Sequence, residues 1–229
     1  MISHRSKPRD PLPRRSQPAR SAATRARLLD ATIASLVEAG FTGTTTGEVC
    51  RRAGVSHGAL LHHYGTRLAL LGATLEHLYE RLRTPVEQGL AALPGGPERL
   101  DALVDLLWAV FGSSEFKAVL ELWVASANDP ALRQRVAPAT DSFDASIQPT
   151  AAGLFPDLAR DVSEFPALVS LLFQIMQGMA LTRAVFRSAD SESRRPEVIA
   201  LTKRLLHSAL AAERRPPERA PTHREGDPA

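Results

Sequence analysis

Three histidine side chains lie close together in the sequence, at His57, His62 and His63. Three imidazoles can hold a zinc ion, but the HExxH spacing is absent and no carboxylate lies one helical turn away from them. The chain also has no glycine-rich phosphate loop and, with a single cysteine, no CxxC pair. We therefore expect no enzyme, no metal ion and no cofactor. Imidazole nitrogens also donate and accept hydrogen bonds, so the elements that position them decide which partner they meet.

The segment 40–67 positions these histidines, and it predicts two short helices joined by a tight turn. Thr45 can cap the first helix, and Glu48 three residues later can reach back to the Thr45 amide, as in a capping box. Gly54 ends this helix where a left-handed backbone is needed. Ser56 then caps the second helix, which carries the histidines.

The second helix has two different faces. Leu60 and Tyr64 are four residues apart and point inward. The outward face carries His57, Gly58, Leu61 and His62. A helix with such a face, held by a glycine turn, is what the DNA major groove admits. The alternative interpretation is an ordinary helical hairpin within an all-α core.

The run AGVSHGALLHHYGTRLALL, residues 53–71, resembles the helix-turn-helix of TetR-family transcriptional regulators, including the Tyr-Gly-Thr-Arg exit into a further helix. The similarity is dense over about residues 24–80 and thinner beyond. It implies an all-α protein, with an N-terminal three-helix head that binds DNA and a C-terminal helical body that binds a ligand and dimerises. The residues expected to contact DNA are Thr45, Thr46, Ser56, His57, Gly58, Leu61, His62, His63 and Arg67. Of these, His57 and His62 are expected at base edges, and His63 and Arg67 at the phosphate backbone.

Two positions depart from the family pattern. The family usually carries a tyrosine where this chain has Leu61, and that hydroxyl commonly bonds a DNA phosphate, which leucine cannot do. The family also often has a basic residue where Gly47 stands. Both departures bear on the affinity for the operator and leave the fold unaffected.

Charge is distributed unevenly along the chain. The net charge of the 229 residues is +3, yet residues 1–70 carry eleven Lys/Arg and four Asp/Glu, a net of +7. A basic first third on an otherwise mildly acidic chain is typical of a nucleic-acid-binding head. A basic tail without a partner would produce the same asymmetry. The apolar share of 44% is that of a soluble protein, and no membrane span is expected, so we expect a cytoplasmic location.

The pattern of apolar residues predicts the domain organisation. Residues 1–20 are expected to be a disordered basic arm, 21–67 the DNA-binding domain, 68–213 the ligand-binding and dimerisation domain, and 214–229 a disordered tail. The arm could lie along DNA, or it could be a solubilising tail. Cys50 lies on an inward face and is expected to be a buried thiol rather than a reactive one.

Individual helices are predicted from their apolar stripes and their breakers. They are expected at about 24–39, 66–83, 97–111, 114–128 and 196–213, with a further helix from Pro130 that Pro138 and Pro149 bend or interrupt. Pro85 is expected just past the end of the second of these helices. Residues 149–166 are expected to be a loop or a broken helix. The segment 164–187 is apolar nearly all round, so a partner subunit is expected to cover one of its sides.

The resemblance implies a ligand pocket inside the body. The candidate lining residues are Trp108, Phe111, Trp123, Asn128, Phe143, Phe173, Gln174 and Gln177. Each aromatic residue among them could instead be plain core. Such a lining would favour a small, mostly apolar effector.

Taken together, the chain is expected to be a homodimeric repressor that a small apolar effector releases from a palindromic operator in double-stranded DNA. The alternative is a constitutive DNA-binding or adaptor protein without a ligand switch.

Overall fold

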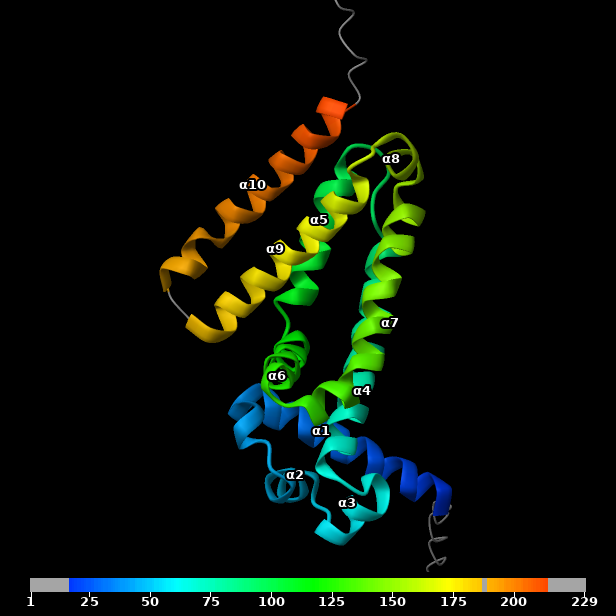
Figure 1. Cartoon of the computed structure of the whole chain (residues 1–229), viewed down its shortest axis with the longest axis vertical. Coiled ribbons are helices and arrows are strands. Elements are labelled where there is room, and N and C mark those ends of the chain that lie inside the picture. The colour runs from blue at the N-terminus through cyan, green and yellow to red at the C-terminus, as the bar shows by residue number, and fades with distance from the viewer. Residues whose placement is uncertain (1–16, 187–188, 214–229) are drawn as a thin grey trace, which may run out of the picture.

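The computed structural model describes residues 17–186 and 189–213. Within these ranges every regular element is an α-helix and no strand is present, so the predicted all-α class is confirmed (Figure 1). The helices are α1 (Gln17–Gly43), α2 (Thr46–Ala53), α3 (His57–Tyr64), α4 (Arg67–Ala91), α5 (Glu98–Phe111), α6 (Ser114–Asn128), α7 (Pro130–Leu154), α8 (Pro156–Asp161), α9 (Phe165–Phe186) and α10 (Ala189–Glu213).

Helices α1, α2 and α3 lie together at one end of the long axis and surround a small core of their own (Figure 1). That core is made by Leu28, Ala31, Val49, Cys50, Ala53, Leu60 and Leu70. Leu70 is the contribution of α4, which leaves the head and runs into the body. Cys50 is buried, as expected, and burial raises the pKa of its thiol, which disfavours the reactive thiolate.

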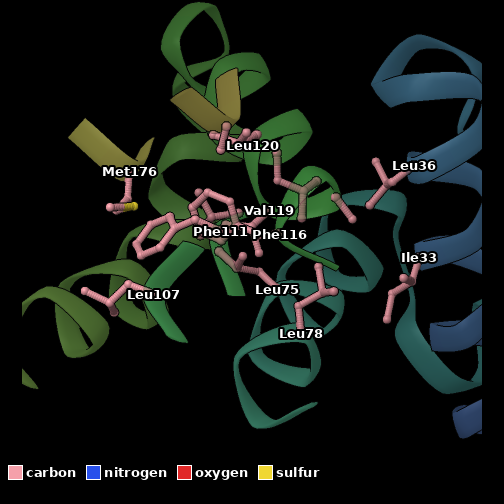
Figure 2. Packing of buried hydrophobic residues seen from close by; sticks show 14 of the residues in the cluster. Ile33, Leu36, Leu75, Leu78, Leu107, Phe111, Phe116, Val119, Leu120 and Met176 are labelled. Carbon is pink, nitrogen blue, oxygen red and sulfur yellow. The ribbon is translucent and has the colours of Figure 1, made fainter. Parts of the chain in front are cut away.

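A second and larger core fills the body (Figure 2). It joins leucines of α4 and α5 to the aromatic residues Phe111 and Phe116 and to Met176 of α9. Ile33 and Leu36 from the second half of α1 belong to this core too. Helix α1 is therefore packed into both cores, and it ties the orientation of the head to the body.

The first helix begins earlier than predicted. It starts at Gln17, so the expectation of a disordered arm is wrong for residues 17–20, and the rest of that arm lies outside the described residues. Pro18 is tolerated because the first turn of a helix has no internal partner for its backbone amides. Gly40 interrupts the helical backbone with φ +70°, as the predicted stop at that residue required.

Prolines do not end helices where the sequence suggested. Helix α4 continues through Pro85 to Ala91, so the expected end before Pro85 is wrong. Helix α7 runs through Pro138 and Pro149, so the interruption expected there as an alternative to a bend is wrong. A proline inside a helix costs on the order of 3 kcal/mol. Packing outweighs this cost, because Leu90 of α4, beyond Pro85, packs half-buried against the body core, and Ala139 and Leu154 of α7, beyond Pro138, do the same. Helix α10 likewise starts at Ala189 rather than at 196.

Other predicted boundaries are confirmed. Asp129 caps α7, with its Oδ1 accepting from the Leu132 amide at 2.9 Å. Residues 149–166 form a broken helix, in which the end of α7, the short α8 and the start of α9 follow one another. The tail from 214 onward lies outside the described residues.

The last two helices lie on one flank of the body (Figure 1). Helix α10 is fixed to α5 by Lys203, whose Nζ lies 2.8 Å from Asp105 Oδ2, and by the buried side chains of Thr202 and Leu206. By length and composition alone, α9 could also cross a membrane. The core helix of a soluble protein passes the same test, so this property alone does not indicate a membrane protein.

Candidate nucleic-acid interface and body cavity

Helix α2 is capped at both ends as its sequence predicts. Thr45 Oγ1 accepts from the Glu48 amide at 3.2 Å, and Gly54 has φ +62° and donates its amide to the Cys50 carbonyl. The reciprocal half of the expected capping box is absent. The Glu48 carboxylate turns instead to Arg51 and Arg52, whose charges make them better partners than a backbone amide.

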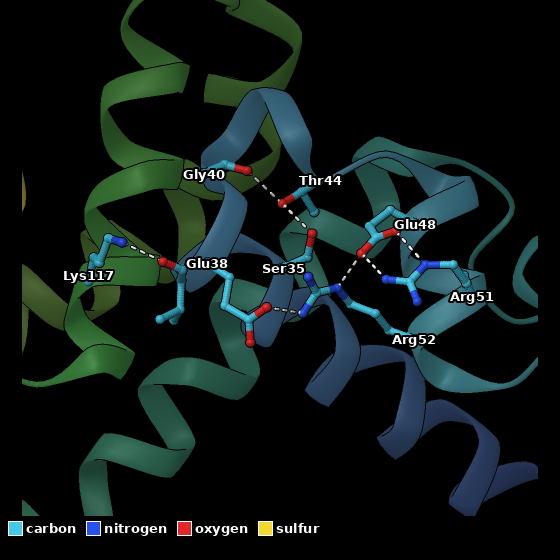
Figure 3. A network of polar contacts seen from close by, with 9 residues as sticks. Ser35, Glu38, Gly40, Thr44, Glu48, Arg51, Arg52 and Lys117 are labelled. Carbon is cyan, nitrogen blue, oxygen red and sulfur yellow. Dashed lines mark hydrogen bonds and ion pairs between the residues drawn. The ribbon is translucent and has the colours of Figure 1, made fainter.

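The Glu48 carboxylate is the centre of a polar network that joins α2 to α1 (Figure 3). Arg52 bonds both Glu48 and Glu38, and Glu38 lies on α1. Hydrogen bonds from Arg51 and Arg52 lower the pKa of Glu48 to about 2. The carboxylate is therefore charged at neutral pH, and the network sets the angle between the two helices.

Helix α3 presents the faces that the sequence predicts. Ser56 Oγ accepts from the Ala59 amide at 3.1 Å, and Leu60 is completely buried. Tyr64 is half-buried, and its hydroxyl donates to the Arg25 carbonyl at 3.3 Å. The exposed residues of the helix include His57, Gly58, Leu61 and His62.

His63 differs from the other two histidines of α3. It is half-buried, and its ring meets that of His62 edge-on at 5.3 Å between centroids. Partial burial, with the nearby charges of His62 and Arg25, lowers the pKa of His63 below its ordinary value of 6.5. Its imidazole is thus neutral at pH 7 in the free protein.

Arg67 does not extend away from the protein as expected for a phosphate contact. Its Nε donates to the Thr44 carbonyl and its Nη2 to the Phe41 carbonyl, both at 3.1 Å. The guanidinium lies over the Phe41 ring, 4.5 Å from its centroid. Burial lowers the pKa of Arg67, which nevertheless stays charged. In the free protein Arg67 holds the corner between α1 and α2, and its expected contact with the DNA backbone stays a prediction.

Thr45 and Thr46, at the start of α2, differ in exposure. Thr45 is exposed, and Thr46 is half-buried in the first turn.

Residues 54–58 also match the letters G-x-S-x-G, a pattern of serine hydrolases. In those enzymes the serine follows a strand, whereas Ser56 stands between two helices and caps the second. The match is therefore a consequence of a glycine turn followed by a capping serine.

The body holds the head at the Gly40 corner. Glu121 of α6 accepts from the Phe41 amide through its Oε2 at 2.9 Å. Lys117, one turn earlier on α6, donates to the Val37 carbonyl of α1 (Figure 3). Phe41 is thus held by Arg67 at its carbonyl and by Glu121 at its amide, and any movement of α6 bears directly on α1.

The body contains an apolar cavity of about 170 Å³ between α4, α5, α7, α8, α9 and α10. Phe143 and Phe173 line it, together with residues that the sequence analysis did not single out, such as Leu103, Leu107, Ile147 and Leu206. Leucines of this kind carry no sequence signal that separates a cavity wall from a packed core. Only the tertiary arrangement distinguishes them.

The polar part of the cavity wall is small. Ser146 and Thr150 are its hydroxyl residues. Ser146 Oγ donates to the Phe143 carbonyl at 2.6 Å, and Thr150 Oγ1 donates to the Ser146 carbonyl at 2.7 Å. Both hydroxyl protons are already used, so the hydroxyls can offer a ligand only acceptor capacity.

The other six pocket candidates do not line this cavity. Phe111 is buried in the body core between Phe116 and Phe173. Trp123 packs edge-on against Phe116, with 5.6 Å between ring centroids. Trp108 and Gln174 lie in a separate groove between α5, α9 and α10. The remaining two are Asn128, exposed at the end of α6, and Gln177, half-buried on α9.

The chain is similar in sequence to known bacterial transcriptional regulators. Residues 28–74 match the family model described as "Bacterial regulatory proteins, tetR family". The regulator CymR of Pseudomonas putida is 32% identical over 170 residues, which cover 73% of this chain and 83% of that protein. An uncharacterised HTH-type transcriptional regulator of Mycobacterium tuberculosis is 29% identical over 181 residues, 79% of this chain and 93% of that protein.

The fold has solved counterparts as well. The crystal structure of a TetR-family regulator from Rhodococcus sp. superposes with a TM-score of 0.64, at 20% identity, over 82% of this chain and 99% of that chain. Proteins of this family are transcriptional regulators rather than enzymes, so the expectation of no enzymatic function is confirmed. The capped helix pair that the sequence places at residues 46–64 lies within the matched region. The chain belongs to the TetR family of DNA-binding transcriptional regulators.

Proposed function

We propose that this regulator is a homodimeric, cytoplasmic repressor that binds a palindromic operator and is released from it by a small apolar effector. The observation that carries the DNA-binding part is the outward face of α3, a capped helix whose polar and small side chains are free of core contacts. In a dimer, each α3 enters a major groove. The two grooves lie about 34–36 Å apart, or a multiple of that, on one side of the duplex.

The open flank of α9 and α10 supports the dimer. Exposed apolar side chains concentrate there: Leu171, Leu181, Val185 and Phe186 on α9, and Val198, Leu201 and Leu205 on α10. A contiguous apolar surface of this kind marks an interaction site in a soluble protein. Two copies related by a two-fold axis would bury it as a four-helix bundle.

The cavity supports the effector. A site of about 170 Å³ walled by leucine and phenylalanine stabilises an uncharged compound through burial of apolar surface. A charged effector would lose its hydration without gaining a counter-charge there. An effector small enough for this volume is of roughly one-ring size, since a leucine-lined cavity of about 150 Å³ holds benzene.

Two connections would carry the effect of a bound compound to the head. Helix α4 begins at Arg67 in the head and lines the cavity with Val86 and Leu90. Phe173 in the cavity wall contacts Phe111, with 5.5 Å between ring centroids, and Phe111 contacts Phe116 of α6. If these helices can take two positions, a compound that binds better to one of them shifts the equilibrium toward it and changes the distance between the heads of the two protomers.

Binding to DNA tests this function. The purified protein is titrated against the duplex that lies upstream of its own gene and against a scrambled duplex, at two salt concentrations. We expect two protomers per duplex, a preference for the upstream DNA that persists at the higher salt, and release by a neutral monocyclic compound. If binding to both duplexes weakens equally as the salt concentration rises, the head contacts only phosphates. Specific binding that no apolar compound affects would favour the constitutive DNA-binding protein.

A further inference from the structure

Leu61 is an apolar side chain on the face of α3 that otherwise carries polar or small residues. It is 45% exposed, and within residues 17–67 it is the one large hydrophobic side chain that is exposed. The other exposed large hydrophobic residues described lie in the body, most of them on the dimer flank. Leu61 therefore needs an explanation that neither the head core nor the dimer provides.

The surroundings of Leu61 leave room for a close approach. Gly58 lies one turn before it on the same side of α3. A Cβ built on Gly58 would meet only Ser56 Oγ, at 3.9 Å, so the space beside it is open. His57 and His62, both exposed, flank this bare stretch of helix. A flat partner can thus reach the helix backbone next to the Leu61 methyl groups.

The chemistry of a major groove offers one apolar partner for such a side chain. Base edges present acceptors and donors there, and the C5-methyl group of thymine is the apolar exception. A phosphate cannot be the partner, because leucine has neither a donor nor a charge. A single exposed leucine is also far smaller than a protein–protein interface, which needs on the order of 1,000 Å².

We propose that Leu61 contacts a thymine C5-methyl group in each operator half-site and selects a T·A pair at that position. This inference rests on the proposed function, because it requires α3 to enter the major groove. Burial of one methyl group corresponds to about a fourfold change in affinity, and two half-sites together to about fifteenfold. Leu61 thus supplies sequence preference at the position where the family usually has a tyrosine that binds a phosphate.

Substitution of thymine by uracil tests the contact, because uracil keeps the base pair and lacks only the methyl group. Duplexes that bind the full-length protein are selected from a random pool, and each thymine of the best duplex is replaced by uracil in turn. At one symmetry-related pair of positions, we expect each uracil substitution to lower the affinity of the native protein for the duplex about fourfold. Leu61→Ala should bind the thymine duplex correspondingly less well and should not distinguish uracil from thymine at that pair.

Two variants serve as controls. Val124→Ala removes an apolar side chain on α6 that is 57% exposed, and it should keep the full sensitivity to uracil. His57→Ala is unsuitable as a control, because His57 is itself expected at a base edge. The second control is Leu61→Met, which should keep a preference for thymine because methionine is also a long apolar side chain. Circular dichroism confirms that each variant is folded.

The outcomes separate the two proposals. If no duplex is selected from the pool, the proposed function and this inference are both overturned. If a palindromic duplex is selected and uracil is tolerated at every position, the inference alone is overturned. The same holds if Leu61→Ala keeps the sensitivity of the native protein to uracil.

Discussion

At the scale of single residues, Arg67 shows how position in a motif and contacts in the fold can assign one side chain two different roles. The resemblance places it at the DNA backbone. In the structure its guanidinium bonds the carbonyls of Phe41 and Thr44 and covers the Phe41 ring. These contacts hold the chain where it leaves α1 and enters α2. Arg67 is therefore a structural residue of the head.

Replacing Arg67 by alanine should destabilise the protein. The change removes two hydrogen bonds from a charged donor and a cation–π contact, and we expect the free energy of unfolding to fall by about 2 kcal/mol. Urea denaturation followed by circular dichroism measures this change, with Arg83→Ala as the control, because Arg83 is exposed and its ion pairs stay within α4. Unchanged stability with equally weakened binding to all duplexes would restore the phosphate contact.

Gly58 offers a substitution in which stability and binding should change in opposite directions. Alanine is accommodated in open space and favours the helix, so Gly58→Ala should raise the free energy of unfolding by up to about 1 kcal/mol. The same methyl group would keep base edges from the helix backbone, so affinity for the selected duplex should fall at least tenfold. Fluorescence anisotropy and thermal unfolding measure the two effects. Undiminished binding would show that DNA does not approach α3 at Gly58.

The lowered pKa of His63 predicts a pH dependence of DNA binding. In the free protein the imidazole is neutral at pH 7, because partial burial and then the charges of His62 and Arg25 oppose its protonation. A nearby phosphate favours the charged form, so DNA affinity should rise as pH falls through and below 6.5. Anisotropy titrations across this range should show a weaker rise for His63→Gln. An identical rise in both proteins would assign the effect to other groups.

At the scale of elements, the contact between α6 and the Gly40 corner links the body to the head. Phe41 donates its amide to Glu121, and Gly40 has a positive φ that permits the sharp change of direction. A Cβ at Gly40 would lie 3.1 Å from Glu121 Oε2, so the two elements also pack closely. Elements that are joined in this way move together.

Removing the Glu121 carboxylate should free the Phe41 amide. We expect hydrogen exchange at this amide to become at least tenfold faster in Glu121→Ala, because a bond to a charged acceptor protects it in the native protein. Glu121→Gln keeps an acceptor oxygen and should retain most of the protection. Exchange measured by mass spectrometry or NMR distinguishes these cases. Equal protection in all three proteins would mean that this bond does not hold the corner.

The elements also show which local signals are reliable. Caps at Thr45, Ser56 and Asp129 and the stop at Gly54 were predictable, because each depends on one side chain and its adjacent backbone. The prolines in α4 and α7 misled the prediction, because their cost is local while the packing that outweighs it comes from distant helices.

At the scale of the whole molecule, the flank formed by α9 and α10 is the largest feature that the single chain leaves incomplete. Phe186 is 70% exposed and Leu205 is 58% exposed. The other side of α10 is fixed to α5, where His207 Nε2 lies 2.9 Å from Asp101 Oδ1. The apolar side of α10 is therefore held outward by contacts within the body.

A charge on this flank should prevent dimerisation. Leu205→Glu would bury two unpaired carboxylates per two-fold interface, and we expect the dimer to weaken at least about a hundredfold. Sedimentation equilibrium measures the change, and binding to the palindromic duplex should weaken with it. Val124→Glu places the same charge on an exposed apolar position of α6 and should leave the dimer intact. A native protein that is monomeric at all concentrations would overturn the proposed interface.

The head was predictable from the sequence. Its helices α2 and α3 are short, and their caps and turns depend on adjacent residues. The spacing of the apolar residues predicts which face of α3 is buried. The open apolar side of α9 was predictable for the same reason, since a helix that is apolar all round cannot be covered by one neighbour.

The cavity of the body could not be predicted from the sequence, because it depends on the tertiary structure. Two of the eight pocket candidates line the cavity, and half of its lining residues are leucines that resemble core residues in sequence. The inward turn of Arg67 likewise depends on carbonyls more than twenty residues away. Local signals act within one or two turns of a helix. A cavity or a long-range hydrogen bond exists only once distant segments have been brought together, and that arrangement depends on the packing of the whole chain.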